Sequence, residues 1–123
     1  IISQFTMKSA QFFKAAQAMI KEQEFDSDMT STFQFEITKG NDSSVWCIDP
    51  ANKRIVEGGI DEPTCSFTLS DDDFMKLITK AVQPAELFMA GKLKLDGDIG
   101  EAMKFQSVME EFDVDPAALK AKL

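Results

Sequence analysis

Few residues of this chain could carry out acid–base or nucleophilic chemistry. The 123 residues include no histidine and no tyrosine. Histidine is the usual general base at neutral pH, and it commonly activates the serine or cysteine that acts as a nucleophile. The remaining side chains form no recognisable pair of nucleophile and base. The sequence therefore predicts a protein that is not an enzyme and that needs no cofactor.

Two acidic segments could in principle bind a metal ion. Asp71, Asp72 and Asp73 are consecutive, and consecutive residues of a helix point in different directions. Their carboxylates are better suited to the positive end of a helix dipole. The segment 96–101, DGDIGE, lacks the spacing of roughly twelve residues that a calcium loop needs before its closing glutamate. We therefore predict no metal site.

Cys47 and Cys65 are the two cysteines, and both lie in segments that resemble strands. Two cysteines in a domain with an ample apolar core do not form a disulfide framework. We expect both thiols to be reduced and to serve as small buried hydrophobic side chains.

The charge of the chain excludes one class of partner. The formal net charge is −8, whereas nucleic-acid binding needs a basic face, so no nucleic acid is expected. Residues 76–95 nevertheless contain four lysines and one acidic residue, Glu86. A solvated charged face is the favoured interpretation of this segment. The alternative is transient contact with an anionic membrane.

The spacing of apolar residues predicts one α/β domain (α+β type) over residues 1–123. The expected order is a helix at 9–23, strands at 32–38, 43–49, 54–57 and 64–69, helices from 70 and 84, a strand at 92–96 and a helix at 99–111. Tight turns favour antiparallel pairing of the first four strands. The helical connection to the fifth strand allows a crossover that places a strand parallel to a neighbour. We predict a five-stranded mixed sheet covered on one face by about five helices.

The segment 88–105, FMAGKLKLDGDIGEAMKF, contains several strong local signals. Gly91 follows a helical apolar run, where a left-handed residue ends many helices. Residues 92–95 alternate between polar and apolar, Asp96 and Gly97 predict a turn, and Asp98 with Glu101 predicts a capping box.

This segment closely resembles the signature of the sterol carrier protein 2 (non-specific lipid-transfer protein) family. Three further segments support the resemblance: TFQF at 32–35, the strand of Trp46 that ends at Ile48 and Asp49, and CSFTL at 65–69 before an acidic helix start. The resemblance implies a sheet under a helical layer that encloses an apolar tunnel. It also implies binding and transfer of fatty acids, fatty acyl-CoAs and sterols, without chemistry. Placed on this chain, the tunnel residues that the resemblance implies are Phe33, Phe35, Trp46, Ile48, Leu69, Phe74, Leu77, Ile78, Phe88, Met89, Leu95, Met103 and Met109, with Gln106 as a head-group contact.

The composition and the C-terminus bear on the same hypothesis. Seven methionines and eleven phenylalanines would suit an adaptable lipid cavity, although composition alone favours an ordinary core. The last three residues, Ala121, Lys122 and Leu123, resemble the Ser-Lys-Leu peroxisomal address. Residues 116–123 are therefore expected to be a targeting tail that binds the peroxisomal import receptor. An accessory domain that presents acyl-CoA or sterols to a peroxisomal β-oxidation enzyme, fused or in trans, is the alternative function.

Overall fold

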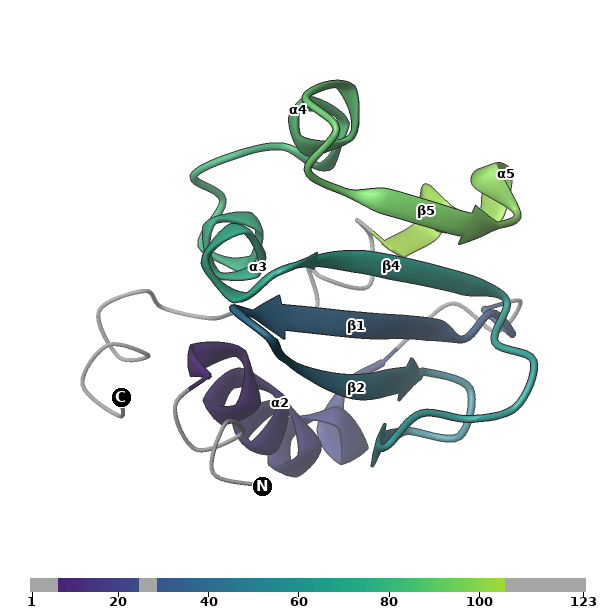
Figure 1. Ribbon diagram of the computed structural model, residues 1–123. Helices are drawn as coiled ribbons and strands as arrows, with labels where there is room; N and C mark the ends of the chain where they lie inside the picture. Colours follow the sequence, from purple (N-terminus) through teal and green to yellow (C-terminus); the bar gives the residue numbers. More distant parts are fainter. Residues whose placement is uncertain (1–6, 25–28, 106–123) are drawn as a thin grey trace.

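The computed structural model describes residues 7–24 and 29–105, and Figure 1 shows a twisted sheet with helices packed against it. The elements are α2 (Lys8–Met19), η1 (Ile20–Glu22), β1 (Phe33–Lys39), β2 (Asp42–Asp49), β3 (Arg54–Glu57), β4 (Cys65–Ser70), α3 (Asp71–Ile78), α4 (Pro84–Met89), β5 (Lys94–Gly97) and α5 (Ile99–Ala102). The predicted fold class, a five-stranded mixed sheet with helices, is confirmed. The last helix was predicted at 99–111, but α5 ends at Ala102, and positions 106–111 lie outside the described residues.

The strand order of the sheet is β3-β2-β1-β4-β5. The β1/β2, β2/β3 and β4/β5 pairs are antiparallel, and β1 and β4 are parallel. The helical connection from β4 to β5 suggested a parallel partner for β5, but β5 is antiparallel to β4. The prediction of antiparallel pairing among the first four strands is also wrong for β4, which pairs with β1 in the parallel direction. The cause is the connection 58–64, which passes over the polar face of β1, where Ile60 N donates to Gln34 Oε1 at 3.0 Å. This path brings β4 to the free side of β1 in the parallel direction.

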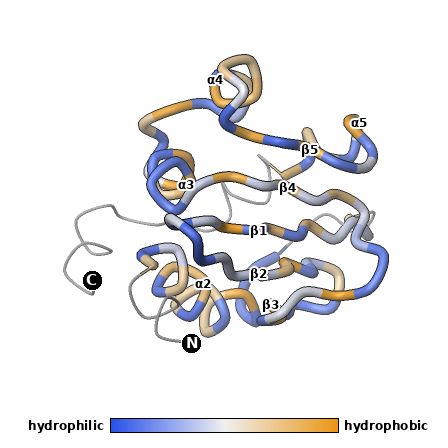
Figure 2. The backbone as a smooth tube through the Cα atoms, in the orientation of Figure 1, coloured by the Kyte–Doolittle hydropathy of each residue, from blue (hydrophilic) through white to orange (hydrophobic). Residues whose placement is uncertain are grey.

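The core lies on one face of the sheet. Phe33, Phe35 and Ile37 of β1 are completely buried, while Glu36 between them is exposed, as the period of two in a strand requires. α2 and α3 cover the buried face. Figure 2 shows hydrophobic residues at the centre of β1, between more hydrophilic loops.

Aromatic rings fill the space between α2, α3 and the sheet. Phe13 of α2 stacks on Trp46 with ring centroids 5.0 Å apart. Phe74 of α3 meets Phe35 edge-on at 5.5 Å, and Phe13 and Phe74 stack at 5.0 Å. Offset-stacked and edge-on pairs are the favoured geometries of aromatic side chains. This part of the interior is therefore solidly packed.

The start of α3 holds α2 in place. Ser70 Oγ accepts from Asp73 N at 3.1 Å, which confirms the predicted cap of α3. Asp71 is buried, and its two carboxylate oxygens accept from Lys8 N and Ser9 N, both at 2.9 Å. These are the first amide groups of α2, whose own N-cap residue supplies no side-chain bond. Asp71 therefore caps a helix more than sixty positions away in sequence, in addition to the predicted effect on α3.

Candidate functional site

A pocket of about 360 Å³ lies between α4, β5 and α5, where the sheet ends at β5. Its walls are apolar apart from one side chain, that of Gln83. The pocket is lined by Phe67, Gln83, Pro84, Ala85, Phe88, Leu93, Leu95, Ile99, Ala102 and Met103. The volume is within the range of about 300–1,000 Å³ that is typical of small-molecule sites.

The pairing of β4 with β5 builds the floor of this pocket. Leu95 stands opposite Phe67 in the antiparallel register, so the two side chains lie on the same face of the sheet. That face continues from the aromatic core, because Phe67 stacks on Phe35 at 5.1 Å. The floor of the pocket is thus the edge of the core that α2 and α3 leave uncovered.

α4 forms one wall. Pro84 occupies its first turn, a position where the missing N–H costs nothing. The helix ends before Gly91, whose φ of +74° is left-handed, as the sequence predicted. Lys92 N and Leu93 N then both donate to Leu87 O, at 2.9 and 3.2 Å. These bonds turn the chain back toward β5 and bring Phe88 and Leu93 to the same pocket.

α5 forms the opposite wall, and hydrogen bonds at its first turn position it. Asp98 Oδ1 accepts from Glu101 N at 3.1 Å, which confirms the predicted cap. The second half of the capping box is replaced, because the Glu101 carboxylate accepts from Ser31 Oγ and pairs with Lys104 Nζ. The hydrogen bond from Ser31, followed by that from Lys104, lowers the pKa of Glu101. Glu101 thus ties α5 to the segment before β1.

Gly97 fixes the approach of β5 to β4. Asp96 and Gly97 are the last residues of β5 rather than a separate turn, and β5 begins at Lys94 rather than at residue 92, so both predictions need correction. Gly97 pairs with Cys65 and has a φ of +112°. A Cβ at this position would lie 2.4 Å from Thr64 O. Only glycine allows the two backbones to come this close.

The structure places the sequence-predicted lipid-binding residues in three groups. Phe88, Leu95 and Met103 line the pocket. Met89 is 86% exposed on α4 and does not line the pocket. Eight others are buried in the core, on the sheet or on α3 itself: Phe33, Phe35, Trp46, Ile48, Leu69, Phe74, Leu77 and Ile78. Gln106 and Met109, and the tail residues Ala121, Lys122 and Leu123, lie outside the described residues.

Sequence reasoning missed part of the lining. It did not assign Phe67, Gln83, Pro84, Ala85, Ile99 and Ala102 to the cavity. A signal for three of them was available, because a proline that opens a short helix predicts where residues 83–85 lie at the start of that helix. Phe67 could be assigned only after the β4/β5 register was known.

The two cysteines of the chain are buried and lie outside the pocket lining. Burial, and then the nearby Asp49 carboxylate, raise the pKa of the Cys47 thiol to about 11. Burial, followed by Asp98, also raises the pKa of Cys65. Across residues 7–24 and 29–105, no three cysteine or acidic side chains lie close enough together to hold a metal ion. None of the helices in the same ranges has the length and hydropathy to cross a membrane. The arrangement can enclose an apolar molecule.

Comparisons with known proteins agree with the fold. The model of the SCP-2 sterol transfer family matches residues 13–110. Sterol carrier protein 2 of Rattus norvegicus is 30% identical over 122 residues, which cover 94% of this chain and 21% of that protein. Peroxisomal multifunctional enzyme A of Dictyostelium discoideum is 31% identical over 81 residues, which cover 63% of this chain and 18% of the enzyme. The chain therefore spans about a fifth of the length of these relatives.

Solved structures show the same fold. The sterol carrier protein domain 2 of Helicoverpa armigera aligns with a TM-score of 0.67 at 22% identity, covering 89% of this chain and 92% of that one. Sterol carrier protein 2 of Aedes aegypti in complex with palmitate aligns with a TM-score of 0.64 at 20% identity, covering 84% of this chain and 94% of that one. The family model covers most of the chain, and we conclude that this protein belongs to the SCP-2 sterol transfer family.

Proposed function

We propose that this chain binds lipids non-catalytically in the pocket between α4, β5 and α5 and transfers them between membranes. The observation that carries the proposal is the pocket itself, which has apolar walls and a single polar side chain, Gln83. Such a lining takes up acyl or ring carbons and leaves a polar head group at the mouth. The ligand classes are fatty acids, fatty acyl-CoAs and sterols.

The expected affinity follows from the area of hydrocarbon removed from water. Each buried methylene contributes about 0.8 kcal/mol, so an acyl chain that buries about ten methylenes gains roughly 8 kcal/mol. Costs of immobilising the ligand reduce this gain, and the polar contacts of the head group add to it. Binding near the micromolar range follows, because a Kd of 1 μM corresponds to about 8 kcal/mol.

The similar proteins support the ligand class and a peroxisomal setting. One similar structure holds palmitate, and one relative is named a peroxisomal multifunctional enzyme. We propose that the C-terminal tripeptide directs this chain to peroxisomes through the import receptor. An accessory role, in which the domain presents acyl-CoA or sterols to a β-oxidation enzyme fused or in trans, is the second candidate. It is favoured by the multifunctional enzyme that shares the domain.

Titration with a fluorescent fatty acid tests the proposed binding, together with native mass spectrometry of the protein and its bound lipid. Leu95→Gln places an amide in the pocket floor, and we expect it to raise the Kd by about tenfold, on the scale of one lost apolar contact. Val56→Gln is the matched control, because Val56 is another half-buried strand residue outside the pocket lining. Wild-type protein without saturable binding would contradict the proposal.

A reporter that ends in residues 116–123 tests the targeting. We expect it to collect in peroxisomes and to become diffuse when the last three residues are removed. A diffuse signal from the intact tail would contradict the peroxisomal part of the proposal, without affecting lipid binding.

A further inference from the structure

The pocket between α4, β5 and α5 has a buried end and an exposed rim. Phe67 and Leu93 are buried at its inner end, with exposed fractions of 5% and 6%. The exposed lining residues, which form the rim, are Gln83, Ala85, Phe88, Ile99 and Met103. A lipid in the pocket therefore has its hydrocarbon at the buried end and its polar group at the rim, since burying a polar group without a partner costs free energy.

Gln83 is the one polar side chain of the lining that a head group meets at this rim. It is the N-cap residue of α4, but its side chain makes no capping hydrogen bond and bonds to no other described residue. The amides of Gln17 and Gln34, in contrast, bond to the backbone of Ile55 and Ile60, each at 3.0 Å. The amide of Gln83 is therefore free to donate to a ligand and to accept from it.

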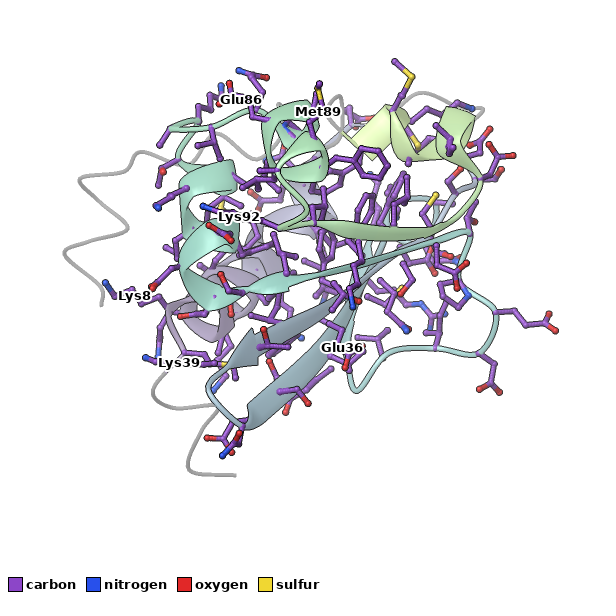
Figure 3. The ribbon with its side chains drawn as sticks, turned by 45° about the horizontal axis from the view of Figure 1, so that its top comes forward. Lys8, Glu36, Lys39, Glu86, Met89 and Lys92 are labelled. Carbon is purple, nitrogen blue, oxygen red and sulfur yellow. The ribbon has the colours of Figure 1, made fainter. Side chains whose placement is uncertain are left out.

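The lysines that neighbour the lining in sequence lie elsewhere or are paired. Lys94 precedes Leu95 in β5, so its side chain is on the opposite face of the sheet from the pocket. Lys104 Nζ pairs with the Glu101 carboxylate at 3.2 Å. In Figure 3, Lys92 lies on the other side of α4 from α5. Among the described residues, no side chain of the pocket lining carries a positive charge.

Acidic side chains surround the same pocket. Glu86 on α4, Asp96 at the end of β5 and Asp98 at the start of α5 are all exposed. Residues 83–104 contain four acidic residues and three lysines. A carboxylate or phosphate at the rim would thus lose part of its hydration without gaining a cation, and desolvating an unpaired charge is costly. A hydroxyl group would lose much less, because the amide of Gln83 replaces its hydrogen bonds with water.

We propose that Gln83 makes this pocket selective for lipids with an uncharged hydrogen-bonding head group, above all a hydroxyl, over lipids with an anionic one. This inference rests on the proposed function and ranks the ligand classes given there. Sterols and long-chain alcohols bind more tightly than ionised fatty acids, and fatty acyl-CoAs bind most weakly because of their phosphates. The hydroxyl of the favoured ligand donates to the carbonyl oxygen of Gln83 or accepts from its NH₂ group.

Calorimetric titration with 1-dodecanol and with dodecanoate tests this selectivity, because the two lipids have the same carbon chain and different head groups. At a pH of about 8 we expect the alcohol to bind about tenfold more tightly than the carboxylate. Lowering the pH to about 6 should tighten binding of the acid and leave binding of the alcohol unchanged, because a site that disfavours the charged form raises the pKa of a bound carboxyl group.

Substitutions of Gln83 test its role in the selectivity. Gln83→Arg should tighten dodecanoate binding by about tenfold, because a guanidinium group forms charge-assisted hydrogen bonds with a carboxylate. Gln83→Ala should weaken dodecanol binding by about fivefold and dodecanoate binding by less than about twofold. Gln23→Arg is the matched control, since it makes the same charge change at a residue outside the lining, and both Kd values should stay near those of the wild type.

The outcomes separate this inference from the proposed function. Equal Kd values for dodecanol and dodecanoate at the higher pH, or tighter binding of dodecanoate, would overturn the selectivity and leave the proposed function intact. Equal losses of both ligands in Gln83→Ala would overturn the role of Gln83, as would equal gains in dodecanoate affinity for Gln23→Arg and Gln83→Arg. Wild-type protein that binds neither lipid saturably would overturn the proposed function itself.

Discussion

Replacing Gly97 by alanine should destabilise this protein far more than the same change at Gly91. Both glycines have positive φ angles, +112° and +74°. A methyl group at Gly91 would meet no atom within 4 Å, whereas at Gly97 it would lie 2.4 Å from Thr64 O and 3.1 Å from Cys65 Cα. The two substitutions therefore share backbone strain and differ in the backbone contact.

The magnitudes follow from these two terms. A left-handed alanine costs about 1–2 kcal/mol, which is the whole expected effect of Gly91→Ala. At Gly97 the strain is of order 1–3 kcal/mol, and relieving the overlap with the Thr64 carbonyl adds about 1–3 kcal/mol. We expect a total near 4 kcal/mol. For a urea m-value of about 2 kcal/mol/M, the midpoint should fall by roughly 2 M for Gly97→Ala and by less than about 1 M for Gly91→Ala.

Urea unfolding followed by Trp46 fluorescence measures both variants, because this single tryptophan is buried against Phe13. Gly97→Ala should also weaken fatty-acid binding at urea concentrations where the variant is still folded, because Gly97 sets the path of the chain from β5 to α5. Equal midpoints for the two variants would refute the argument that Gly97 is required by the β4/β5 approach.

Three further predictions concern buried polar and reactive groups. Asp71→Asn should lower the free energy of unfolding by about 1–3 kcal/mol, because the amide has one acceptor oxygen for two N–H donors. The control is Asp72→Asn, which makes the same charge change at an exposed neighbouring position and should cost little stability. Equal urea midpoints for the two variants would contradict the capping role of Asp71. Burial raises the pKa of Cys47 to about 11 and also raises that of Cys65. Iodoacetamide at neutral pH should therefore label neither thiol until urea unfolds the protein. Rapid labelling of the folded protein would contradict this prediction. Burial of Asp49 opposes its ionisation. Hydrogen bonds from the side chains of Asn52 and Arg54 outweigh the effect of burial and lower the pKa of Asp49. The stability that Asp49 contributes is present above its unfolded pKa of about 4 and is lost as the pH falls through its lower folded pKa. Asp49→Asn should therefore flatten the acid limb of a plot of unfolding free energy against pH. An unchanged acid limb would contradict this role of Asp49.

Local signals in the sequence were sufficient for most element boundaries. The Ser70 cap, the left-handed Gly91 and the Asp98 cap all depend on residues within one or two turns. Such features follow from short-range hydrogen bonding and backbone sterics, which a sequence displays directly.

Features that depend on long-range contacts could not be predicted in the same way. The parallel pairing of β1 with β4 follows from a connection that contacts Gln34, and nothing in the residues of that connection specifies this path. The buried Asp71 looks like an ordinary first-turn carboxylate until α2 is placed beside it. The Glu101 carboxylate accepts from Ser31 and not from the start of its own helix, and these two residues are seventy positions apart.

The candidate site shows the same limit. Alternation in β1 and β4 predicts which side chains turn inward, and Phe33, Phe35 and Leu69 are indeed buried. It does not predict where helices cover that inner face and where they leave space. α2 and α3 fill the region over β1 with aromatic rings, and the pocket remains over β5, where α4 and α5 stand on either side.

The location of a bound acyl chain tests the central claim most directly. Intermolecular nuclear Overhauser effects from ¹³C-labelled palmitate to the methyl groups of the protein report which side chains touch the lipid. We predict contacts to Leu95, Ile99 and Ala102, which line the pocket, and none to Ile48 or Ile78, which lie in the core. Contacts to Ile48 and Ile78 without contacts to Leu95 and Ile99 would contradict the assignment of the pocket between α4, β5 and α5 as the lipid site.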